Sequence, residues 1–321
     1  MTSTPASPTP CGRYAPSPSG DLHLGNLRTA LLAWMMARSA GGRFVMRVED
    51  LDRVKKGAAE RQLADLTALG IDWDGPVLYQ STRLSAYADA LAHLRQAGLV
   101  YECYCTRKEI QEASTAPHGA PGAYPGTCRN LTEAERAERR QVRPASLRLK
   151  AQVKEWTVTD RFAGPYTDAV DDFVLVRADG VYAYNLACVV DDNYQGVTEI
   201  VRGDDLLPSA PRQAYLAQLL GLQVPTYAHV PLALNTEGKR LAKRDGAVTL
   251  AELTAAGVSR QQMMRMIAAS IPLPPLTGTQ TGGNSPRLPE TAAEMLTIFT
   301  PENIRQAPWI VPLQEPQNAH P

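Results

Sequence analysis

Residues 11–26 read CGRYAPSPSGDLHLGN, in which a short apolar run leads into a loop of proline, serine and glycine. The apolar patterns predict a strand at Cys11–Pro16, a helix at Asn26–Ser39 and a second strand at Arg43–Val48. These elements make a βαβ unit, so the loop lies between a strand and the N-terminus of a helix. Backbone N–H groups and the helix dipole favour an anion there, which makes the loop a candidate site for a nucleotide phosphate.

The alternation of strands and helices continues beyond this unit. Further strands are expected at Phe173–Val176, Val197–Val201 and His229–Leu234. Further helices are expected at Lys56–Leu69, Leu84–Gln96, Leu131–Arg140, Ser209–Leu220, Ser259–Ala268 and Thr291–Phe299. Such alternation is typical of a Rossmann-like α/β domain with a parallel sheet.

A break in the alternation predicts an inserted module, because residues 103–150 are rich in cysteine, proline and glycine and then highly charged. We therefore expect, in chain order, a disordered tail at 1–11, the first half of the α/β domain at 12–102, the insertion at 103–150, the second half at 151–250 and a short helical region at 251–321. The stretch Pro272–Pro286, rich in proline, glycine and threonine, is expected to be a loop within the last part.

Charge and hydropathy exclude several classes of protein. The 321 residues include 33 basic and 33 acidic side chains, so no overall charge points to a nucleic-acid partner. The first ten residues, MTSTPASPTP, lack the basic and apolar regions of a signal peptide, and no apolar run reaches the roughly 20 residues that cross a bilayer. We expect a cytoplasmic protein without a membrane span. A local basic excess at Arg129–Lys154 could contact RNA phosphates, or could simply be solvated.

A second cation-rich stretch lies far downstream, where residues 238–246 read GKRLAKRDG. A flexible loop of this kind can close over a polyphosphate and bring a lysine ammonium to it, whereas a solvated turn is the alternative for a basic run taken alone. In the first loop, His23 could hydrogen-bond a phosphate and Gly25 could allow a nucleotide close to the backbone. The alternative there is a loop with one exposed histidine.

Three of the five cysteines lie within 26 residues of one another. With a nearby tyrosine they offer three thiolates and one phenolate, enough for a tetrahedral zinc site. This candidate ligand set is Cys103, Cys105, Tyr124 and Cys128. The Cys-x-Cys spacing is unusual for zinc, so free thiols, or His118 as the fourth ligand, are alternatives. Cys11 and Cys188 lie in apolar contexts and are expected in the core.

Two short motifs carry a resemblance to a known family. Residues 23–26 read HLGN and residues 240–244 read RLAKR, and in this order and separation they resemble the HIGH and KMSKS signatures of class I aminoacyl-tRNA synthetases. Four longer stretches narrow the resemblance to the glutamyl branch and extend it over most of residues 12–255. These are RYAPSPSG at 13–20, RVEDLD at 47–52, YNLACVVDD at 184–192 and VRGDDLL at 201–207.

The chain is similar to truncated members of this branch. Glutamyl-tRNA synthetases carry a long helical anticodon-binding region after KMSKS, whereas only 77 residues follow Arg244, so we expect that region to be missing. The truncated members attach glutamate to the queuosine base in the anticodon of tRNA(Asp). The resemblance therefore implies a monomeric, ATP-dependent ligase that forms glutamyl-adenylate without tRNA and transfers glutamate to that base, with Mg²⁺ accompanying ATP and zinc holding the insertion.

Residue roles follow from the matching positions. The implied catalytic residues are His23, Asn26 and Lys243. The implied ATP-binding residues are Ser19, Gly20, His23, Gly25, Arg240 and Lys243. The implied glutamate-binding residues are Arg13, Tyr14, Ala15, Pro16, Ser17, Glu49, Tyr184 and Arg202. The chemistry is apt, because an arginine binds a carboxylate bidentately and an acidic side chain accepts from an ammonium. Arg202 or Arg13 is expected to bind the γ-carboxylate, and the matching insertion of the family binds zinc through the same Cys, Cys, Tyr and Cys set.

Departures and alternatives qualify these roles. Asn26 stands where HIGH has its second histidine, and Ala242 and Arg244 stand where KMSKS has serines. Structural alternatives are a core position for Tyr184, pairing of Arg202 with Asp204 or Asp205, and a helix cap or exposed pair, favoured over a magnesium site, for Asp191 and Asp192. Rival functions are a ligase with a small-molecule acceptor and an inactive zinc-bearing RNA-binding paralogue.

Overall fold

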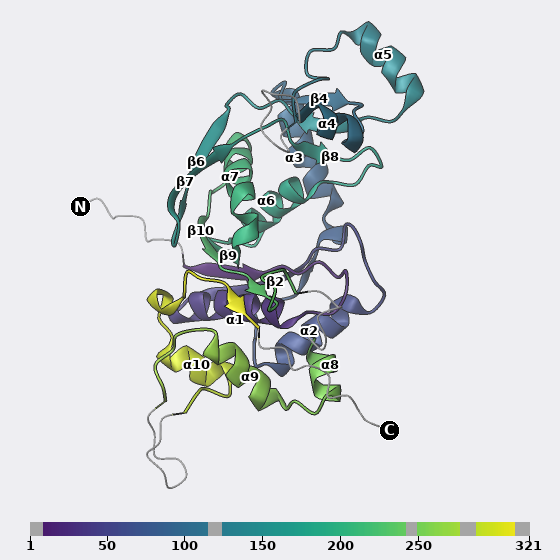
Figure 1. Cartoon of the computed structure of the whole chain (residues 1–321). Helices are drawn as coiled ribbons and strands as arrows, with labels where there is room; N and C mark the ends of the chain where they lie inside the picture. Colours follow the sequence, from purple (N-terminus) through teal and green to yellow (C-terminus); the bar gives the residue numbers. More distant parts are fainter. Residues whose placement is uncertain (1–8, 115–123, 242–248, 277–286, 312–321) are drawn as a thin grey trace, which may run out of the picture. The chain divides into compact units, whose positions relative to one another are not determined.

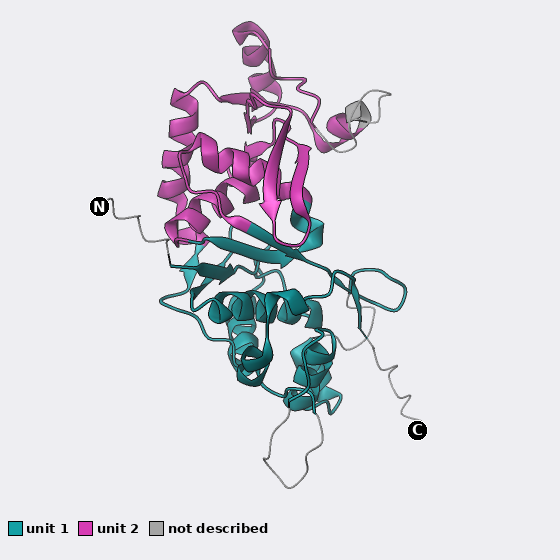
Figure 2. Ribbon diagram, turned by 90° about the vertical axis from the view of Figure 1, so that its left-hand side faces the viewer, with its two compact units in different colours: residues 1–79, 197–207, 227–321 teal, residues 80–196, 208–226 magenta. Residues whose placement is uncertain are grey.

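The chain passes back and forth between two units, which Figure 2 shows in different colours. Unit 1 consists of residues 1–79, 197–207 and 227–321, and unit 2 consists of residues 80–196 and 208–226. The computed structural model describes residues 9–114, 124–241, 249–276 and 287–311, apart from the side chains of 112–114. The domain boundaries expected from the sequence stay a prediction.

Unit 1 is built on a parallel sheet (Figure 1). Its strands are β1 (Cys11–Tyr14), β2 (Arg43–Val48), β3 (Leu78–Tyr79), β9 (Glu199–Gly203), β10 (Thr226–Val230), β11 (Ala233–Leu234) and β12 (Trp309–Ile310). β2 lies between β1 and β3, and both pairings are parallel. On the other side of β1, the N–H of Thr198 donates to the carbonyl of Cys11 over 2.9 Å, and β9 and β10 follow as neighbours. The predicted parallel α/β sheet is confirmed.

The helices of unit 1 are α1 (Leu24–Ser39), α2 (Ala58–Ala68), α8 (Leu250–Ala255), α9 (Arg260–Ala269) and α10 (Ala292–Ile298), with short 3₁₀ turns at Asp204–Ser209 and Pro301–Asn303. α1 is the central helix and is buried along nearly its whole length. It packs closely on β1, because a Cβ at Gly12 would lie 3.0 Å from the Cβ of Ala37. A buried arginine fastens α1 to later parts of the unit. Arg28 donates to Ser270 Oγ over 2.9 Å and to the carbonyl of Pro231 over 2.8 Å, and burial lowers its pKa to about 10.

Unit 2 combines helices with an antiparallel sheet and a hairpin. Its helices are α3 (Leu84–Gln96), α4 (Arg107–Ser114), α5 (Glu133–Val142), α6 (Tyr184–Tyr194) and α7 (Ala210–Leu219), preceded by a 3₁₀ turn at Gln80–Thr82. Its strands are β4 (Val100–Cys103), β5 (Ser146–Leu149), β6 (Glu155–Asp160), β7 (Gly164–Ala169) and β8 (Val174–Val176). β5 pairs antiparallel with β4 and β8, and β6 pairs antiparallel with β7. Apolar side chains from α3, β5, β8, α6 and α7 form one core.

A buried carboxylate joins α6 to α3. Asp191 is fully buried and accepts from Tyr87 Oη over 2.5 Å, from Gln80 Nε2 over 3.2 Å and from Arg83 Nε over 3.2 Å. The Arg83 guanidinium also lies 3.7 Å from the ring centroid of Tyr194. The expectation of a helix cap or an exposed pair for these two aspartates was therefore wrong, since Asp192 is buried as well. A polar side chain enters a helical core here because three donors satisfy it.

Most predicted elements are found, and α3 and β2 have the predicted bounds. The β6–β7 hairpin was not predicted. The burial prediction for Cys11 and Cys188 is confirmed, since both are 2% exposed. Among the described residues, no helix has the length and apolar character needed to cross a membrane.

Candidate active site and metal centre

The candidate phosphate-binding loop, between β1 and α1, ends at a histidine that caps α1. His23 has an extended backbone, and its Nδ1 accepts from the N–H groups of Gly25 and Asn26 over 3.1 and 3.3 Å. Burial lowers the pKa of His23 below its usual 6.5, so the imidazole is neutral at pH 7. Because Nδ1 accepts, the proton is on Nε2, where it can be donated. The ring thus serves both as helix cap and as a donor at the positive end of α1.

Asn26 and Gly25 each have a structural reason for their identity. Asn26 Oδ1 accepts from the backbone N–H of His23 over 3.2 Å, which completes a reciprocal capping box. A Cβ at Gly25 would lie 2.8 Å from the Cβ of Ala233 and 3.1 Å from the His23 ring. The position therefore requires glycine because the chain itself fills the adjacent space, a reason that the sequence did not reveal.

Three hydrogen bonds hold the loop before His23 in one conformation. Gln62 of α2 is buried and its Nε2 donates to the carbonyls of Ser17 and Gly20 over 3.1 and 2.6 Å. The N–H of Lys55 donates to the carbonyl of Pro18 over 2.8 Å. Ser19 is exposed, and the Lys55 ammonium lies 3.8 Å from where a Cβ of Gly20 would be. The loop is thus preorganised, with a cation beside it.

Charged side chains gather where neighbouring strands end. Arg13 is 5% exposed, and its NH1 donates over 3.2 Å to the carbonyl of Val201, the residue before Arg202. Arg202 is equally buried and donates through Nε to His229 Nε2 over 3.0 Å. Glu49 follows β2 and accepts from Arg47 NH2 over 3.3 Å. Two arginines from β1 and β9 and a carboxylate after β2 thus lie at strand ends, where ligands bind in open α/β sheets.

Tyr14 connects this cluster to the start of α1. Its hydroxyl donates to the carbonyl of Asn26 over 3.3 Å, and burial raises its pKa well above the usual value. Ala15, Pro16 and Ser17 continue the chain from Tyr14 into the loop, and Pro16 is buried. Among the predicted glutamate residues of unit 1, Tyr14 therefore contacts the first turn of α1 directly.

The second cation-rich loop is described at its two ends. Arg240 forms an ion pair of 2.6 Å with Asp205, and a turn held by Asn235 and Gly238 precedes it. On the far side, Thr249 forms a backbone bridge with His23. Lys243, Ala242 and Arg244 lie outside the described residues, so their roles stay predictions.

Tyr184 is the first residue of α6 in unit 2. It is 40% exposed, so the alternative that it is a core residue was wrong. Its neighbour Asn185 accepts from Gln213 Nε2 over 3.2 Å, which fixes the start of the helix.

The cysteine cluster has the dimensions of a zinc site. The sulfurs of Cys103, Cys105 and Cys128 all lie within 4.8 Å of one another, and those of Cys105 and Cys128 are 3.6 Å apart. The Tyr124 hydroxyl lies 3.3 Å from Cys103 Sγ and 3.7 Å from Cys105 Sγ. A tetrahedron with metal–sulfur bonds of about 2.3 Å has edges of about 3.8 Å. These four residues therefore fit a tetrahedral ion, whereas the alternative ligand His118 lies outside the described residues.

The surroundings of the cluster suit a bound cation. Burial, together with the neighbouring thiols, raises the pKa of Cys105 to about 12. Burial also raises the pKa of Tyr124 far above its usual range. Ionisation of Cys105 and Tyr124 at neutral pH therefore requires a positive charge at the centre of the cluster. The Arg148 guanidinium lies 3.7 Å from the centroid of the Tyr124 ring and covers one of its faces.

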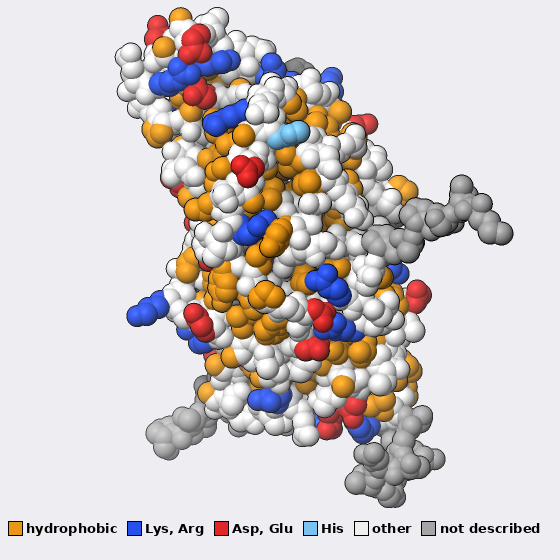
Figure 3. All heavy atoms as spheres, turned by 180° about the vertical axis from the view of Figure 1, so that it is seen from behind, with side chains coloured by type: hydrophobic (Ala, Val, Ile, Leu, Met, Phe, Trp, Pro, Cys, Tyr) orange, Lys and Arg blue, Asp and Glu red, His pale blue; other side chains and the backbone are white. Residues whose placement is uncertain are grey.

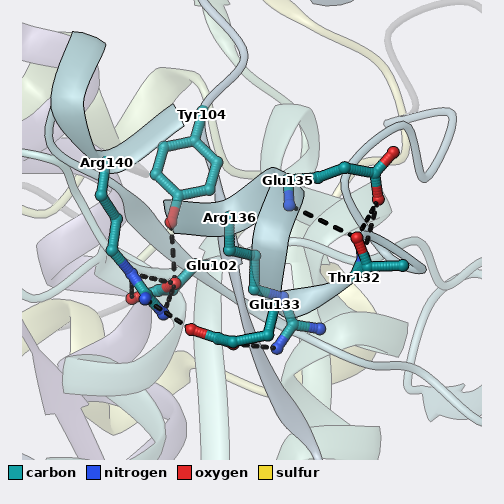
Figure 4. A network of polar contacts seen from close by, with 7 residues as sticks. All are labelled: Glu102, Tyr104, Thr132, Glu133, Glu135, Arg136 and Arg140. Carbon is teal, nitrogen blue, oxygen red and sulfur yellow. Dashed lines mark hydrogen bonds and ion pairs between the residues drawn. The ribbon is translucent and has the colours of Figure 1, made fainter. Parts of the chain in front are cut away.

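Ion pairs attach the exposed helix α5 to the cysteine segment (Figure 4). Arg140 donates to Glu102 over 2.7 Å and to Glu133 over 2.6 Å, and Tyr104 Oη donates to Glu102 over 2.7 Å. None of the residues of α5 is buried, so these polar contacts take the place of an apolar face. Arg129, Arg136 and Arg143 are paired with carboxylates as well. On the face that Figure 3 shows, acidic and basic side chains are likewise interspersed.

Comparison with known proteins decides the family. A family model described as the catalytic domain of class I tRNA synthetases (E and Q) matches residues 11–271. The chain belongs to the class I tRNA synthetases. This synthetase is 61% identical over 301 residues to a Nocardia farcinica protein named glutamyl-Q tRNA(Asp) synthetase, covering 94% of this chain and 92% of that one. It is 52% identical over 268 residues to a protein of the same name from Cutibacterium acnes, covering 82% and 76%.

The solved structures agree with this assignment. A glutamate tRNA ligase from Elizabethkingia meningosepticum, crystallised with its amino acid, superposes with a TM-score of 0.77 at 26% identity. The alignment covers 94% of this synthetase and 67% of that ligase. The resemblance inferred from the motifs is confirmed, and the chain is a ligase of the class I synthetase fold.

Several residues that shape the synthetase site were not predicted from the sequence. Gln62 and Lys55 hold and flank the loop, and His229 contacts Arg202. A glutamine at an otherwise apolar helix position and a histidine within a predicted strand were the available signals. Each becomes informative only when its tertiary partner is known.

Proposed function

We propose that the protein activates L-glutamate with ATP, in the absence of tRNA, and transfers the glutamyl group to the queuosine base in the anticodon of tRNA(Asp). The main support is that two buried arginines, Arg13 and Arg202, lie near the ends of strands β1 and β9, and that β1 leads through the loop into the His23-capped helix α1. A substrate that carries a carboxylate and a phosphate-bearing co-substrate suit these two neighbouring features. Two relatives named glutamyl-Q tRNA(Asp) synthetase align with this chain over most of their own length, and their name supports the same reaction.

For the amino acid, the proposed contacts are those that the matching family positions imply. Arg202 binds the γ-carboxylate, since a guanidinium matches a carboxylate geometrically and electrostatically. Glu49 accepts from the α-ammonium, with Arg13, Ser17 and the backbone of Tyr14, Ala15 and Pro16 completing the pocket in unit 1. Tyr184 is the remaining residue proposed for glutamate, through its phenolic oxygen.

For ATP, the proposed chemistry is an in-line attack of the α-carboxylate on the α-phosphorus, with release of pyrophosphate. His23 donates through Nε2 to phosphate oxygens as their charge increases, and the N-terminus of α1 adds its partial positive charge. Asn26 positions His23 through the capping box. Lys243 and Arg240 neutralise the phosphates from the second loop, together with Mg²⁺, while Ser19, Gly20 and Gly25 contact the nucleotide.

Zinc is proposed as a structural ion bound by Cys103, Cys105, Tyr124 and Cys128. All four positions of the tetrahedron are filled by the chain, so no position is open for chemistry. Beside it, unit 2 has a groove of about 350 Å³, whose lining includes Tyr124, Arg148, Asn185 and Arg212.

The decisive experiment is amino-acid-dependent exchange of pyrophosphate into ATP, measured without tRNA across a panel of amino acids. Exchange that requires glutamate supports the activation step. If folded, zinc-loaded protein gives no pyrophosphate exchange with any amino acid, the protein is instead an inactive RNA-binding paralogue.

A second experiment identifies the acceptor. Labelled glutamate is supplied with tRNA(Asp) that contains queuosine and with the same tRNA carrying guanosine at that position, and the product is mapped by nuclease digestion. Label on the anticodon fragment of the first tRNA alone is the expected result. Label at the 3′ end, or on a small amine and not on tRNA, would overturn the acceptor assignment.

A further inference from the structure

We propose that His229 is a positioning residue of the amino-acid site, which orients the Arg202 guanidinium through a neutral acceptor that does not itself offset the positive charge. The inference rests on the proposed role of Arg202 in binding glutamate. It concerns a residue on the neighbouring strand β10, which lies outside the motifs that carry the family resemblance.

The geometry that supports the proposal is local and buried. Arg202 and His229 are 5% and 4% exposed, and Arg202 Nε donates to His229 Nε2 over 3.0 Å. Arg202 NH2 donates to the carbonyl of Leu206 over 3.2 Å. Two bonds from different nitrogens fix the plane of a guanidinium, which leaves little rotation at the end of the side chain.

The imidazole is itself held in place. Its ring stacks on Tyr227, with centroids 5.9 Å apart and an interplanar angle of 14°. The Arg202 guanidinium lies 5.6 Å from the centroid of the same Tyr227 ring. Tyr227 is 1% exposed, so both partners of the bond pack against one buried ring.

The direction of the bond defines the protonation state. An arginine nitrogen can only donate, so Nε2 of His229 must present its lone pair, and the imidazole is neutral with its proton on Nδ1. A carboxylate at this position would orient Arg202 equally well but would cancel its charge. A neutral acceptor separates these two effects, which is the physical reason for a histidine beside an arginine that must attract an anionic substrate.

Three substitutions at this site separate orientation from charge. His229→Gln supplies a neutral oxygen near the position of Nε2, so the KM for glutamate is expected to stay within about threefold of the wild-type value. His229→Phe keeps an aromatic ring on Tyr227 but removes the acceptor, and His229→Glu keeps an acceptor but adds a negative charge. Both are expected to raise that KM by about tenfold or more, with kcat and the KM for ATP nearly unchanged.

The assay is glutamate-dependent pyrophosphate exchange on the full, zinc-loaded chain. His93→Phe, on the exposed surface of α3, is the matched control and is expected to behave as wild type. If His229→Phe fails to fold, the Gln and Glu variants still decide, because they differ only in charge. Equal KM values for these two variants would overturn the proposal. Wild-type protein that shows no glutamate-dependent exchange would overturn the proposed function itself, which is a separate outcome.

Discussion

Replacement of Asp191 by asparagine is expected to destabilise the protein far more than its conservative chemistry suggests. The carboxylate is fully buried and accepts from three donors, two of which, Tyr87 Oη and Gln80 Nε2, are buried as well. Tyr87 and Gln80 share one carboxylate oxygen, which the asparagine oxygen can replace, but the asparagine NH2 group then lies against Arg83 Nε, so two donors face each other without an acceptor. The ion pair with Arg83 is lost at the same time.

The magnitude follows from these contacts. An unsatisfied buried donor costs about 1–3 kcal/mol, and breaking a buried ion pair costs about 3–5 kcal/mol. The Arg83 side chain is 18% exposed and can regain some hydration, so we expect a total loss of about 3 kcal/mol. Since domains are stable by only about 5–15 kcal/mol, this is a large fraction.

The assay is urea unfolding followed by circular dichroism, with amide hydrogen exchange of α3 and α6 as a local readout. Asp89→Asn, on the exposed face of α3, is the matched control and is expected to change the free energy of unfolding by less than about 0.5 kcal/mol. An Asp191→Asn protein as stable as the control would refute the reasoning.

Three further predictions address other parts of the molecule. Cys128→Ser is expected to weaken zinc binding strongly, measured by metal content and chelator competition. Cys188→Ser is the control and should bind as much zinc as the wild type. Equal zinc content in the two variants would show that the cluster is not the metal site. Gly25→Ala is expected to displace the His23 cap and lower both stability and exchange rate, because its Cβ would lie 2.8 Å from Ala233 Cβ, while Gly20→Ala meets nothing closer than 3.8 Å and should fold normally. The N–H of Phe44 and then Arg38 hold the pKa of Asp74 below its usual 3.8, so this carboxylate stabilises the fold above pH 3.8 and the contribution is lost as the pH falls through the lowered pKa. Unfolding measured from pH 6 to pH 2 should therefore show a shallower acid decline in Asp74→Asn than in the wild type, and identical curves would contradict this linkage.

The candidate phosphate-binding loop between β1 and α1 illustrates how much of the site was predictable. The strand, the loop and the helix from Cys11 to Ser39 follow from local patterning, and the structure has them within two residues of the predicted bounds. That Asn26 is a capping partner of His23, and not merely a departure from the motif, required the hydrogen bond to be seen. Capping patterns built on histidine and asparagine are uncommon, so the sequence offers little signal for them.

The β6–β7 hairpin shows why other elements were missed. Its strands alternate between exposed and partly buried positions, and their polar residues resemble a loop in composition. The hairpin depends on Asp160, which accepts from the N–H groups of Phe162 and Ala163, and on Gly164, which has φ of +72°. A turn of this kind depends on residues close together in the sequence, yet it can be recognised only once the two strands that it joins are known to pair.

The sequence by itself determined the elements whose apolar period is strong, the cysteine set that can hold a metal, and the motifs that identify the family. These signals are local, because periodicity and spacing are properties of neighbouring residues. Only the tertiary structure decided which polar groups meet, as when Asp191 meets Tyr87 or Arg202 meets His229. Such pairs join residues far apart in the chain, and the free energy that selects them comes from burial and hydrogen bonding that exist only once the strands and helices have packed.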